Sequence, residues 1–305
     1  MERLEKLLRE RCPELELRRD EPMSRHTSFR IGGPAALMAL PRTRGEAKAA
    51  VKTAREMGIE PFFLGNGSNL LVADEGYPGF LIKLGGTYSV DNLNRVWEVN
   101  RCLAAGGAVP LSHLAGSAYG RNLTGLEFAG GIPGSVGGAI TMNAGAYGGE
   151  IAQVLEEVDF LDEAGEVCTL PASECGLGYR RSVFSDRKCL ILEARFRLEP
   201  GDPASIKARM DELAAKRKEK QPLEYPSAGS MFKRPPGHFA AALIDQCGLK
   251  GLTVGGAQVS EKHAGFIINR GGATCADVLE LVDRVKEEVL RQTGVELEME
   301  VKVLR

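Results

Sequence analysis

A glycine-rich segment, Gly125 to Gly149, carries the strongest chemical signal in the chain. It reads GLEFAGGIPGSVGGAITMNAGAYGG and holds nine glycines in 25 residues. The interleaved apolar side chains Ile132, Val136 and Ile140 argue against a solvent-exposed spacer. Glycine serves where the backbone must take a positive φ or approach another group closely, and successive amide N–H groups can converge on an anion or a flat polar ring. We favour a backbone-lined cofactor pocket; the alternative is a glycine-rich turn that closes a buried strand.

A second polar loop points to the same chemistry. The pentapeptide GNGSN lies between apolar flanks and comprises Gly65, Asn66, Gly67, Ser68 and Asn69. As the turn of a strand–loop–strand unit, its N–H groups, hydroxyl and amides could hold a pyrophosphate. The alternative is a β-hairpin, because Asn-Gly is a favoured type I′ turn pair. With the glycine-rich segment downstream, we favour nucleotide binding.

The composition limits the possible classes of protein. A chain of 305 residues with 43% hydrophobic residues is long for one domain, so we expect two or three. A net charge of −2 argues against a general nucleic-acid binder. No apolar run reaches membrane-spanning length, and residues 1–15 are typical of a charged amphipathic helix, not a secretory signal. The seven cysteines form no CxxC pair, which disfavours a zinc or thioredoxin-type site and fits reduced thiols in a cytoplasm.

The usual nucleotide and hydrolase motifs are missing. Leu70 stands where a GxGxxG pattern needs its third glycine, and no Gly-Lys pair exists for a P-loop. HExxH and GxSxG are also absent. The chain is therefore expected to bind a dinucleotide by a non-Rossmann route.

Helices and strands that could position these loops follow from the hydrophobic pattern. We predict strands that begin at Pro61 and at Phe80, and a half-solvated strand with period two at 190–198. The last helix should begin at Thr274 with Asp277 in capping-box spacing and end at Gly294. Further helices are expected at 44–57, 111–119, 204–220 and 238–247, and further strands at 95–105, 154–161 and, as an edge strand, 297–304.

Six motifs in order carry a family resemblance. They are RHTSFRIGGPA (25–35), LGNGSNLLVAD (64–74), the glycine-rich segment to Glu150, GYRRSVF (178–184), PSAGSMFKRP (226–235) and LEMEV (297–301). Together they resemble the bacterial UDP-N-acetylenolpyruvoylglucosamine reductases over nearly the whole chain. The short segment before PSAGSMFKRP is similar to the family's compact subclass.

The resemblance implies an α+β fold with three domains. Residues 1–86 and 87–199 would form an FAD-binding unit of the vanillyl-alcohol-oxidase type, and residues 200–305 an α/β substrate-binding domain. The GNGSN loop would hold the pyrophosphate of non-covalent FAD. The residues implied to approach the isoalloxazine are Gly130, Gly131, Ile132, Gly134, Ser135 and Gly138.

The implied reaction is an NADPH-dependent, cytoplasmic step of peptidoglycan precursor synthesis. Reduced flavin would deliver hydride from N5 to the enolpyruvyl ether of UDP-N-acetylglucosamine-enolpyruvate, giving UDP-N-acetylmuramate. Arg180 would stabilise the enolate, since a guanidinium can meet a carboxylate bidentately, and Ser230 would donate the proton. Glu300 would hydrogen-bond the enediolate or position a water or the serine.

Other implied contacts have structural alternatives. Tyr179 is assigned to the substrate side, with packing as its alternative. Lys220 and Lys233 are candidates for the substrate diphosphate, or else helix-end and solvent-facing cations. Glu298 shares the LEMEV motif, whose register favours Glu300, and Arg234 stands where the family often has asparagine.

Two other functions remain open from the sequence. One is an FAD oxidase of an alcohol or sugar acid on the same cofactor fold. The other is a non-catalytic nucleotide-sugar-binding protein. A visible spectrum bleached by NADPH and restored by the enolpyruvyl substrate would exclude both.

Overall fold

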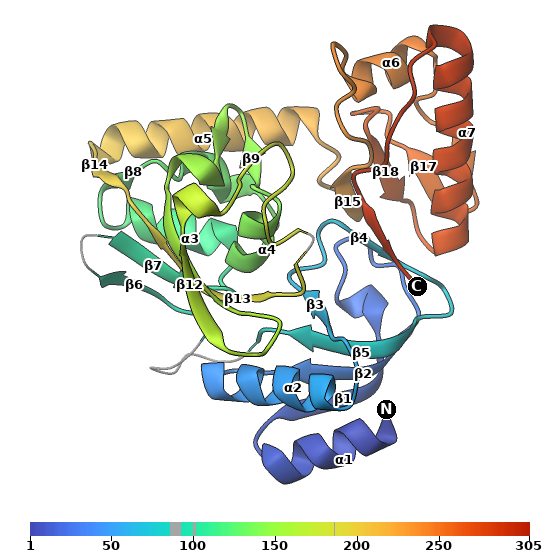
Figure 1. Ribbon diagram of the computed structural model, residues 1–305. Helices are drawn as coiled ribbons and strands as arrows, with labels where there is room; N and C mark the ends of the chain where they lie inside the picture. Colours follow the sequence, from blue (N-terminus) through green and yellow to red (C-terminus); the bar gives the residue numbers. More distant parts are fainter. Residues whose placement is uncertain (86–92, 100–101, 186) are drawn as a thin grey trace. The chain divides into compact units, whose positions relative to one another are not determined.

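The computed structural model describes residues 1–85, 93–99, 102–185 and 187–305. It forms two compact units, each assembled from several segments of the chain (Figure 1). Unit 1 comprises residues 1–19, 37–66 and 79–216; unit 2 comprises residues 20–36, 67–78 and 217–305. The predicted three-domain division stays a prediction, and its boundary at 86/87 lies outside the described residues.

A five-stranded antiparallel sheet forms the centre of unit 1. Its strand order is β12-β11-β13-β7-β6. One face packs against α3 and α4 through a core that includes Leu114, Ile140 and Phe196. The strands are β6 (Val96–Val99), β7 (Cys102–Gly106), β11 (Leu155–Leu161), β12 (Val167–Pro171) and β13 (Leu190–Phe196), and the helices are α3 (Leu111–Tyr119) and α4 (Val136–Thr141).

The N-terminal part of the chain contributes a second sheet and two helices. The four-stranded order is β1-β2-β5-β3. Leu4 of α1, Val51 of α2 and Phe80 of β5 share one buried cluster with Leu192 of β13. The bounds are α1 (Glu2–Arg11), β1 (Glu16–Pro22), β2 (Pro34–Leu40), α2 (Arg44–Glu56), β3 (Phe62–Leu64) and β5 (Tyr77–Lys83).

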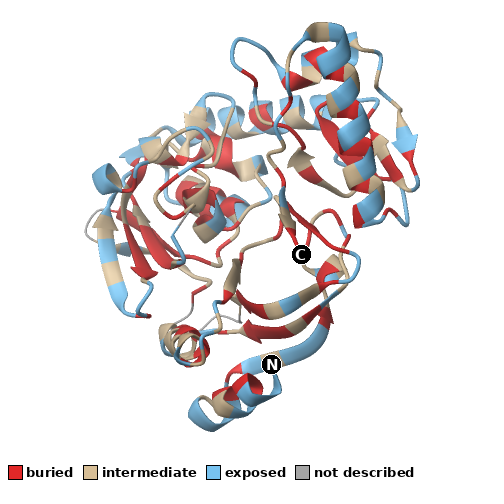
Figure 2. Cartoon of the chain, turned by 45° about the vertical axis from the view of Figure 1, so that its right-hand side comes forward, coloured by how far each residue is buried: buried red, intermediate tan, exposed pale blue. Residues whose placement is uncertain are grey.

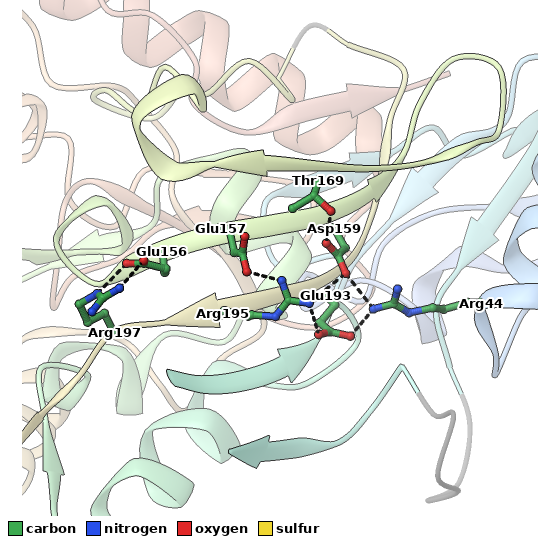
Figure 3. Close-up of polar contacts among 8 residues, drawn as sticks. All are labelled: Arg44, Glu156, Glu157, Asp159, Thr169, Glu193, Arg195 and Arg197. Atoms are coloured by element: carbon green, nitrogen blue, oxygen red, sulfur yellow. Dashed lines mark hydrogen bonds and ion pairs between the residues drawn. The ribbon is translucent and has the colours of Figure 1, made fainter. Parts of the chain in front are cut away.

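The prediction of a half-solvated strand at 190–198 is wrong. Glu193 is only 7% exposed, because β13 is the central strand and Arg44 at the start of α2 reaches its polar face. Arg44 also contacts Asp159 on β11 at 3.1 Å, and Arg195 contacts both Asp159 and Glu157 (Figure 3). The alternation in sequence reflects an ion-pair network on one face of the sheet, in which Asp159 and Glu193 are buried and the arginines are partly exposed.

Unit 2 is built on a four-stranded antiparallel sheet, β15-β18-β17-β16, with α6 and α7. The buried residues of α7 recur at helical spacing and form one face, as expected for an amphipathic helix (Figure 2). Beside this sheet, β19 pairs in parallel with β4. The bounds are β4 (Leu70–Val72), β15 (Ser227–Ser230), α6 (Ala240–Gln246), β16 (Thr253–Val254), β17 (Ala257–Val259), β18 (Phe266–Asn269), α7 (Cys275–Thr293) and β19 (Lys302–Leu304).

Most predicted helices are confirmed within a few residues. The predicted ends of α7 are also confirmed, with a capping box of Thr274 and Asp277 at its start and a left-handed Gly294 at its end. Only residues 302–304 of the predicted C-terminal edge strand form a strand. The remaining elements are α5 (Pro203–Lys220), β8 (Leu123–Thr124), β9 (Gly145–Ala146), β10 (Gly149–Glu150), β14 (Glu199–Pro200), η1 (Met23–Arg25), η2 (Glu127–Gly131), η3 (Ile151–Gln153) and η4 (Ala172–Glu174).

Candidate functional site

In unit 1, Gly65, the first residue of the GNGSN loop, lies against Ser135 and Gly138 of the glycine-rich segment. A Cβ atom added to Gly65 would stand 2.7 Å from the Ser135 hydroxyl and 3.9 Å from the Gly138 Cα. Ser135 caps α4, since its hydroxyl accepts the N–H of Gly138 at 3.4 Å. A side chain at position 65 would therefore displace the Ser135 hydroxyl that caps α4.

Close approach without a positive φ explains three glycines of the 125–149 segment, Gly137, Gly145 and Gly149. Among its nine glycines only Gly125 and Gly148 have a positive φ. A Cβ on Gly137 would stand 3.2 Å from the Gly107 carbonyl, and one on Gly149 would lie 2.5 Å from the Phe128 ring. The N–H groups of Gly134 and Ser135 donate to no acceptor within the described part of the chain. These two donors are free to meet a ligand.

The GNGSN loop is not a β-hairpin. The strand before it, β3, pairs in parallel with β5, and the strand after it, β4, pairs in parallel with β19. Gly67 has a φ of +61°, and a Cβ there would stand 2.0 Å from the His26 carbonyl oxygen, so only glycine fits. Among the described residues, no acceptor pairs with the N–H groups of Asn66 and Ser68. The loop therefore presents backbone donors, as the nucleotide-binding interpretation requires.

Arg180 lies at the tip of a tight turn in unit 1. Gly178 and Arg181 exchange both backbone hydrogen bonds, at 3.0 and 3.2 Å. Arg180 itself has a φ of +55°, and its guanidinium donates to the Gly145 carbonyl at 3.5 Å. A non-glycine residue held in this region costs about 1 kcal/mol or more and is often found at functional sites. The neighbouring Tyr179 is 59% exposed, and the Arg180 guanidinium lies 5.4 Å from its ring centroid.

Asn143 is a site residue that the sequence analysis missed. It is 2% exposed and has a φ of +42°. Its side chain donates to the Gly178 carbonyl at 3.1 Å and accepts the Ala152 N–H at 2.9 Å. Asn143 thus fastens the Arg180 turn to the glycine-rich segment. The signal was available, because asparagine tolerates positive φ better than other non-glycine residues.

In unit 2, Ser230 follows a β-bulge. Residues 227 and 230 of β15 pair with residues 268 and 266 of β18, so β15 holds one extra residue. Gly229, with a φ of +79°, supplies the conformation that the bulge needs. The Ser230 hydroxyl donates to the Phe232 carbonyl at 3.2 Å. Bulges of this kind redirect a side chain and are common beside active sites.

The segment that carries Glu300 runs beside the segment after Ser230. Phe232 and Met299 form an antiparallel bridge, and the Glu300 N–H donates to the Met231 carbonyl at 2.9 Å. Glu298, by contrast, is exposed and forms an ion pair with Lys233. Of the two glutamates in LEMEV, Glu298 is therefore paired on the surface, whereas the backbone of Glu300 is bound to the segment that follows Ser230.

Four further predicted residues lie at the ends of helices. Lys220 ends α5 and is exposed. Gly130 and Gly131 end η2, and Ile132 follows it. Gly65, Asn66, residues 130–138, Tyr179 and Arg180 belong to unit 1; Gly67, Ser68, Asn69, Lys220, Ser230, Lys233 and Glu300 belong to unit 2.

The cysteines show no sign of activation. All seven are free. Burial raises the pKa of Cys175, Cys189 and Cys275 to about 11. A thiol is nucleophilic only as the thiolate, so these three are inert near neutral pH. Cysteine chemistry therefore does not compete with the serine and arginine candidates.

Comparison with known proteins identifies the family. The FAD binding domain family matches residues 35–171, and the C-terminal domain of UDP-N-acetylenolpyruvoylglucosamine reductase matches residues 221–304. A protein of that name from Clostridium botulinum is 50% identical over 93% of this chain and 91% of its own. The chain belongs to the UDP-N-acetylenolpyruvoylglucosamine reductase family. A Geobacillus kaustophilus member is 48% identical over 99% of this chain and 98% of its own.

A solved structure agrees with this assignment. The crystal structure of the reductase from Thermus caldophilus has a TM-score of 0.79 and 38% identity, and the match covers 96% of this chain and 99% of that one. The predicted α+β class with an FAD-binding unit of the vanillyl-alcohol-oxidase type is confirmed. Reductase-family membership also favours the reductase over the oxidase alternative.

The residues present fit the FAD that the reductase family uses. Gly65, Ser135 and Gly138 pack closely, and unused backbone N–H groups lie at both segments. Such donors suit a pyrophosphate or the polar edge of a flavin ring. Within the described ranges, no helix is both long and apolar enough to cross a membrane.

Proposed function

We propose that this protein uses NADPH, through bound FAD, to reduce the enolpyruvyl ether of UDP-N-acetylglucosamine-enolpyruvate to UDP-N-acetylmuramate. The observation that carries the proposal is the identity of 48–50% to reductases of that name over at least nine-tenths of both chains. Peptidoglycan precursor synthesis in the cytoplasm and the choice of NADPH rest on the family resemblance.

Once reduced by NADPH, bound FAD would supply the hydride that reduces the enolpyruvyl double bond. The protein must then stabilise negative charge next to the substrate carboxylate. We assign this role to Arg180, because a guanidinium group can meet two carboxylate oxygens at once. The turn from Gly178 to Arg181 and the Asn143 contact restrict where that guanidinium can reach. A donor fixed before the reaction stabilises developing charge without reorganising.

Ser230 is proposed to supply the proton. Its hydroxyl donates to the Phe232 carbonyl at 3.2 Å, a long hydrogen bond that rotation about χ1 can break. Breaking the hydrogen bond to the Phe232 carbonyl, so that the hydroxyl can turn toward the substrate carbanion, costs little free energy, since one such bond contributes about 1 kcal/mol. The Glu300 backbone is fixed beside Met231, from where its carboxyl group would hold a water or the enediolate. Backbone N–H groups at residues 66–68 and 134–135 are proposed to hold FAD.

Ser230→Ala tests the proposal directly. The variant should bind FAD and be reduced by NADPH at a rate within about twofold of wild type. Its re-oxidation by the enolpyruvyl substrate should fall by at least 10²-fold, because general acid catalysis typically contributes that much. Stopped-flow flavin absorbance under anaerobic conditions separates the two phases.

Ser230→Cys serves as the matched variant, since a thiol restores a donor of similar shape. Partial recovery of re-oxidation is expected. If Ser230→Ala re-oxidises as fast as wild type, the proton comes from elsewhere, and a water held by Glu300 becomes the better donor. If wild-type flavin is not re-oxidised by the substrate at all, the proposed reaction itself is wrong.

A further inference from the structure

The motif RHTSFRIGG (25–33) has no role in the proposed chemistry, yet it lies at the centre of unit 2. The Ser28 N–H donates to the Gly67 carbonyl at 3.1 Å, and its hydroxyl donates to the Ser227 carbonyl at 2.6 Å. One residue therefore joins the GNGSN loop to β15, the strand that ends at Ser230.

Asn69 makes a second connection from the same loop. Its side-chain amide donates to the Glu300 carbonyl at 3.1 Å, and its own carbonyl accepts the Lys302 N–H at 3.2 Å. The parallel pairing of β4 with β19 continues from this point. The backbone of Glu300 is thus held on both sides, by Asn69 and by Met231.

We propose that Ser28 and Asn69 are positioning residues that fix Ser230 and Glu300 to the loop Gly67–Asn69. The loop that is proposed to hold the cofactor would then also set the place of both proposed proton-handling groups. Binding of FAD to this loop would order them together. This inference rests on the proposed function, which assigns the roles of Ser230 and Glu300.

The geometry explains why such anchors are needed. Gly229 lies between Ser227 and Ser230, which pair with Ile268 and Phe266 of β18, and glycine gives this bulge more backbone freedom than another residue would. Ser28 holds that base at Ser227. A displacement of about 1 Å at a reacting group can cost up to 10²-fold in rate. The anchors therefore matter for chemistry even though neither side chain is assigned to the substrate.

The test compares Ser28→Ala and Asn69→Ala with wild type, all saturated with FAD. Re-oxidation by the enolpyruvyl substrate should slow by about tenfold in each variant. Reduction by NADPH should change by less than about twofold in Ser28→Ala, because Ser28 lies outside the segments proposed to hold FAD. Asn69 belongs to the GNGSN loop, so for Asn69→Ala the readout is the ratio of the two rates, with re-oxidation slowed more than reduction. The second readout is amide hydrogen exchange. In wild type, adding FAD to apoprotein should slow exchange in peptides covering 227–233 and 298–304, and each variant should lose the slowing in its own peptide.

Thr27→Val is the matched control for Ser28→Ala. The neighbouring Thr27 hydroxyl donates to Ile31, within its own turn, at 3.0 Å. This control should lower thermal stability without separating the two half-reactions. Asn69→Ser provides a milder second change if Asn69→Ala does not fold. In a Glu300→Gln background, Asn69→Ala should cause no further loss, because residues that act as one unit are non-additive.

The inference is overturned if both half-reactions slow equally, if Thr27→Val reproduces the selective loss, or if the Asn69 and Glu300 effects add. It is also overturned if FAD leaves exchange in both peptides unchanged. Failure of the proposed function would look different, since wild-type flavin would then not respond to the enolpyruvyl substrate.

Discussion

Arg180 has a backbone conformation that is unusual for its residue type. It lies at the tip of a turn with φ +55°, close to two further non-glycine residues with positive φ, Asn143 and Tyr147. Three such residues in one small region of unit 1 mark a segment whose local strain the surrounding structure compensates. We infer that this conformation is retained because it fixes where the guanidinium points.

Arg180→Ala should slow re-oxidation of the flavin by the substrate and leave the protein folded and yellow. Removal of one preorganised charge donor typically costs about 3–4 kcal/mol in the affected step. Reduction by NADPH should change much less, because no carboxylate-linked anion forms in that half-reaction. Stopped-flow measurement of both phases checks this.

Arg181→Ala is the control at this turn. Arg181 is exposed, and its backbone already closes the turn with Gly178. Its loss should leave both phases near wild type. Equal damage to both phases by Arg180→Ala would indicate a general binding role and contradict the assignment.

The ion pairs that Arg44 of α2 forms with β11 and β13 connect a helix to the sheet (Figure 3). Burial raises the pKa of Glu193, and the nearby Arg44 opposes that rise. A carboxyl group whose pKa is raised in the folded state binds its proton more tightly there than in the unfolded chain. Its contribution to stability therefore falls as the pH rises through the folded-state pKa.

Arg44→Ala should destabilise the protein by about 1–2 kcal/mol at pH 7.5. Breaking a buried pair costs more, but the Arg44 side chain is 39% exposed and water screens its charge. The loss should shrink as the pH falls through the pKa of Glu193, since a protonated Glu193 needs no cation. Urea unfolding at pH 7.5 and pH 5 measures the difference.

Arg197→Ala provides the comparison, at an exposed ion pair beside the same strands. Arg197 pairs with Glu156 and its side chain is 60% exposed. An exposed pair contributes less than about 1 kcal/mol. The idea is contradicted if Arg44→Ala lowers the free energy of unfolding no more than Arg197→Ala does, or by the same amount at both pH values. Burial of Glu193 would then not strengthen its ion pair.

The elements that depend on local sequence could be predicted, and those that depend on distant partners could not. The capping box of Thr274 and Asp277 is encoded within four residues and was correct. The same helix end is also capped by Asp74, whose carboxylate accepts the N–H groups of Cys275 and Ala276 at 2.7 and 3.0 Å. No local pattern reveals a partner 201 positions away.

The candidate site shows the same limit. Glycine density revealed where the backbone approaches another segment closely, but not that Gly65 meets Ser135. The hairpin alternative for GNGSN was wrong because β4 pairs with β19, more than 200 residues further along the chain. The anchoring of Glu300 by Asn69 depends on that same long-range pairing.

At the scale of the whole molecule, cofactor binding should contribute to stability without a covalent link. The segments proposed to hold FAD, 65–69 and 130–138, contain no cysteine or histidine that could attach to a flavin. Acid precipitation should therefore release all flavin into the supernatant. Free FAD at 100 times its dissociation constant should stabilise the folded apoprotein by about 2.7 kcal/mol, because a ligand that binds only the folded state shifts the unfolding equilibrium by mass action.

Gly65→Val should abolish this stabilisation. A Cβ at position 65 already stands 2.7 Å from the Ser135 hydroxyl and 3.9 Å from the Gly138 Cα, so the valine side chain must displace that hydroxyl and would crowd the start of α4. Gly58→Val is a poor control, because Gly58 has a φ of +71°. Gly116→Ala is better, since a Cβ there has no heavy atom within 4 Å outside its own helix, and it should keep the full response to FAD. Urea unfolding with and without FAD measures both variants, and flavin in the acid pellet, or an unchanged FAD response in Gly65→Val, would contradict the proposed cofactor site.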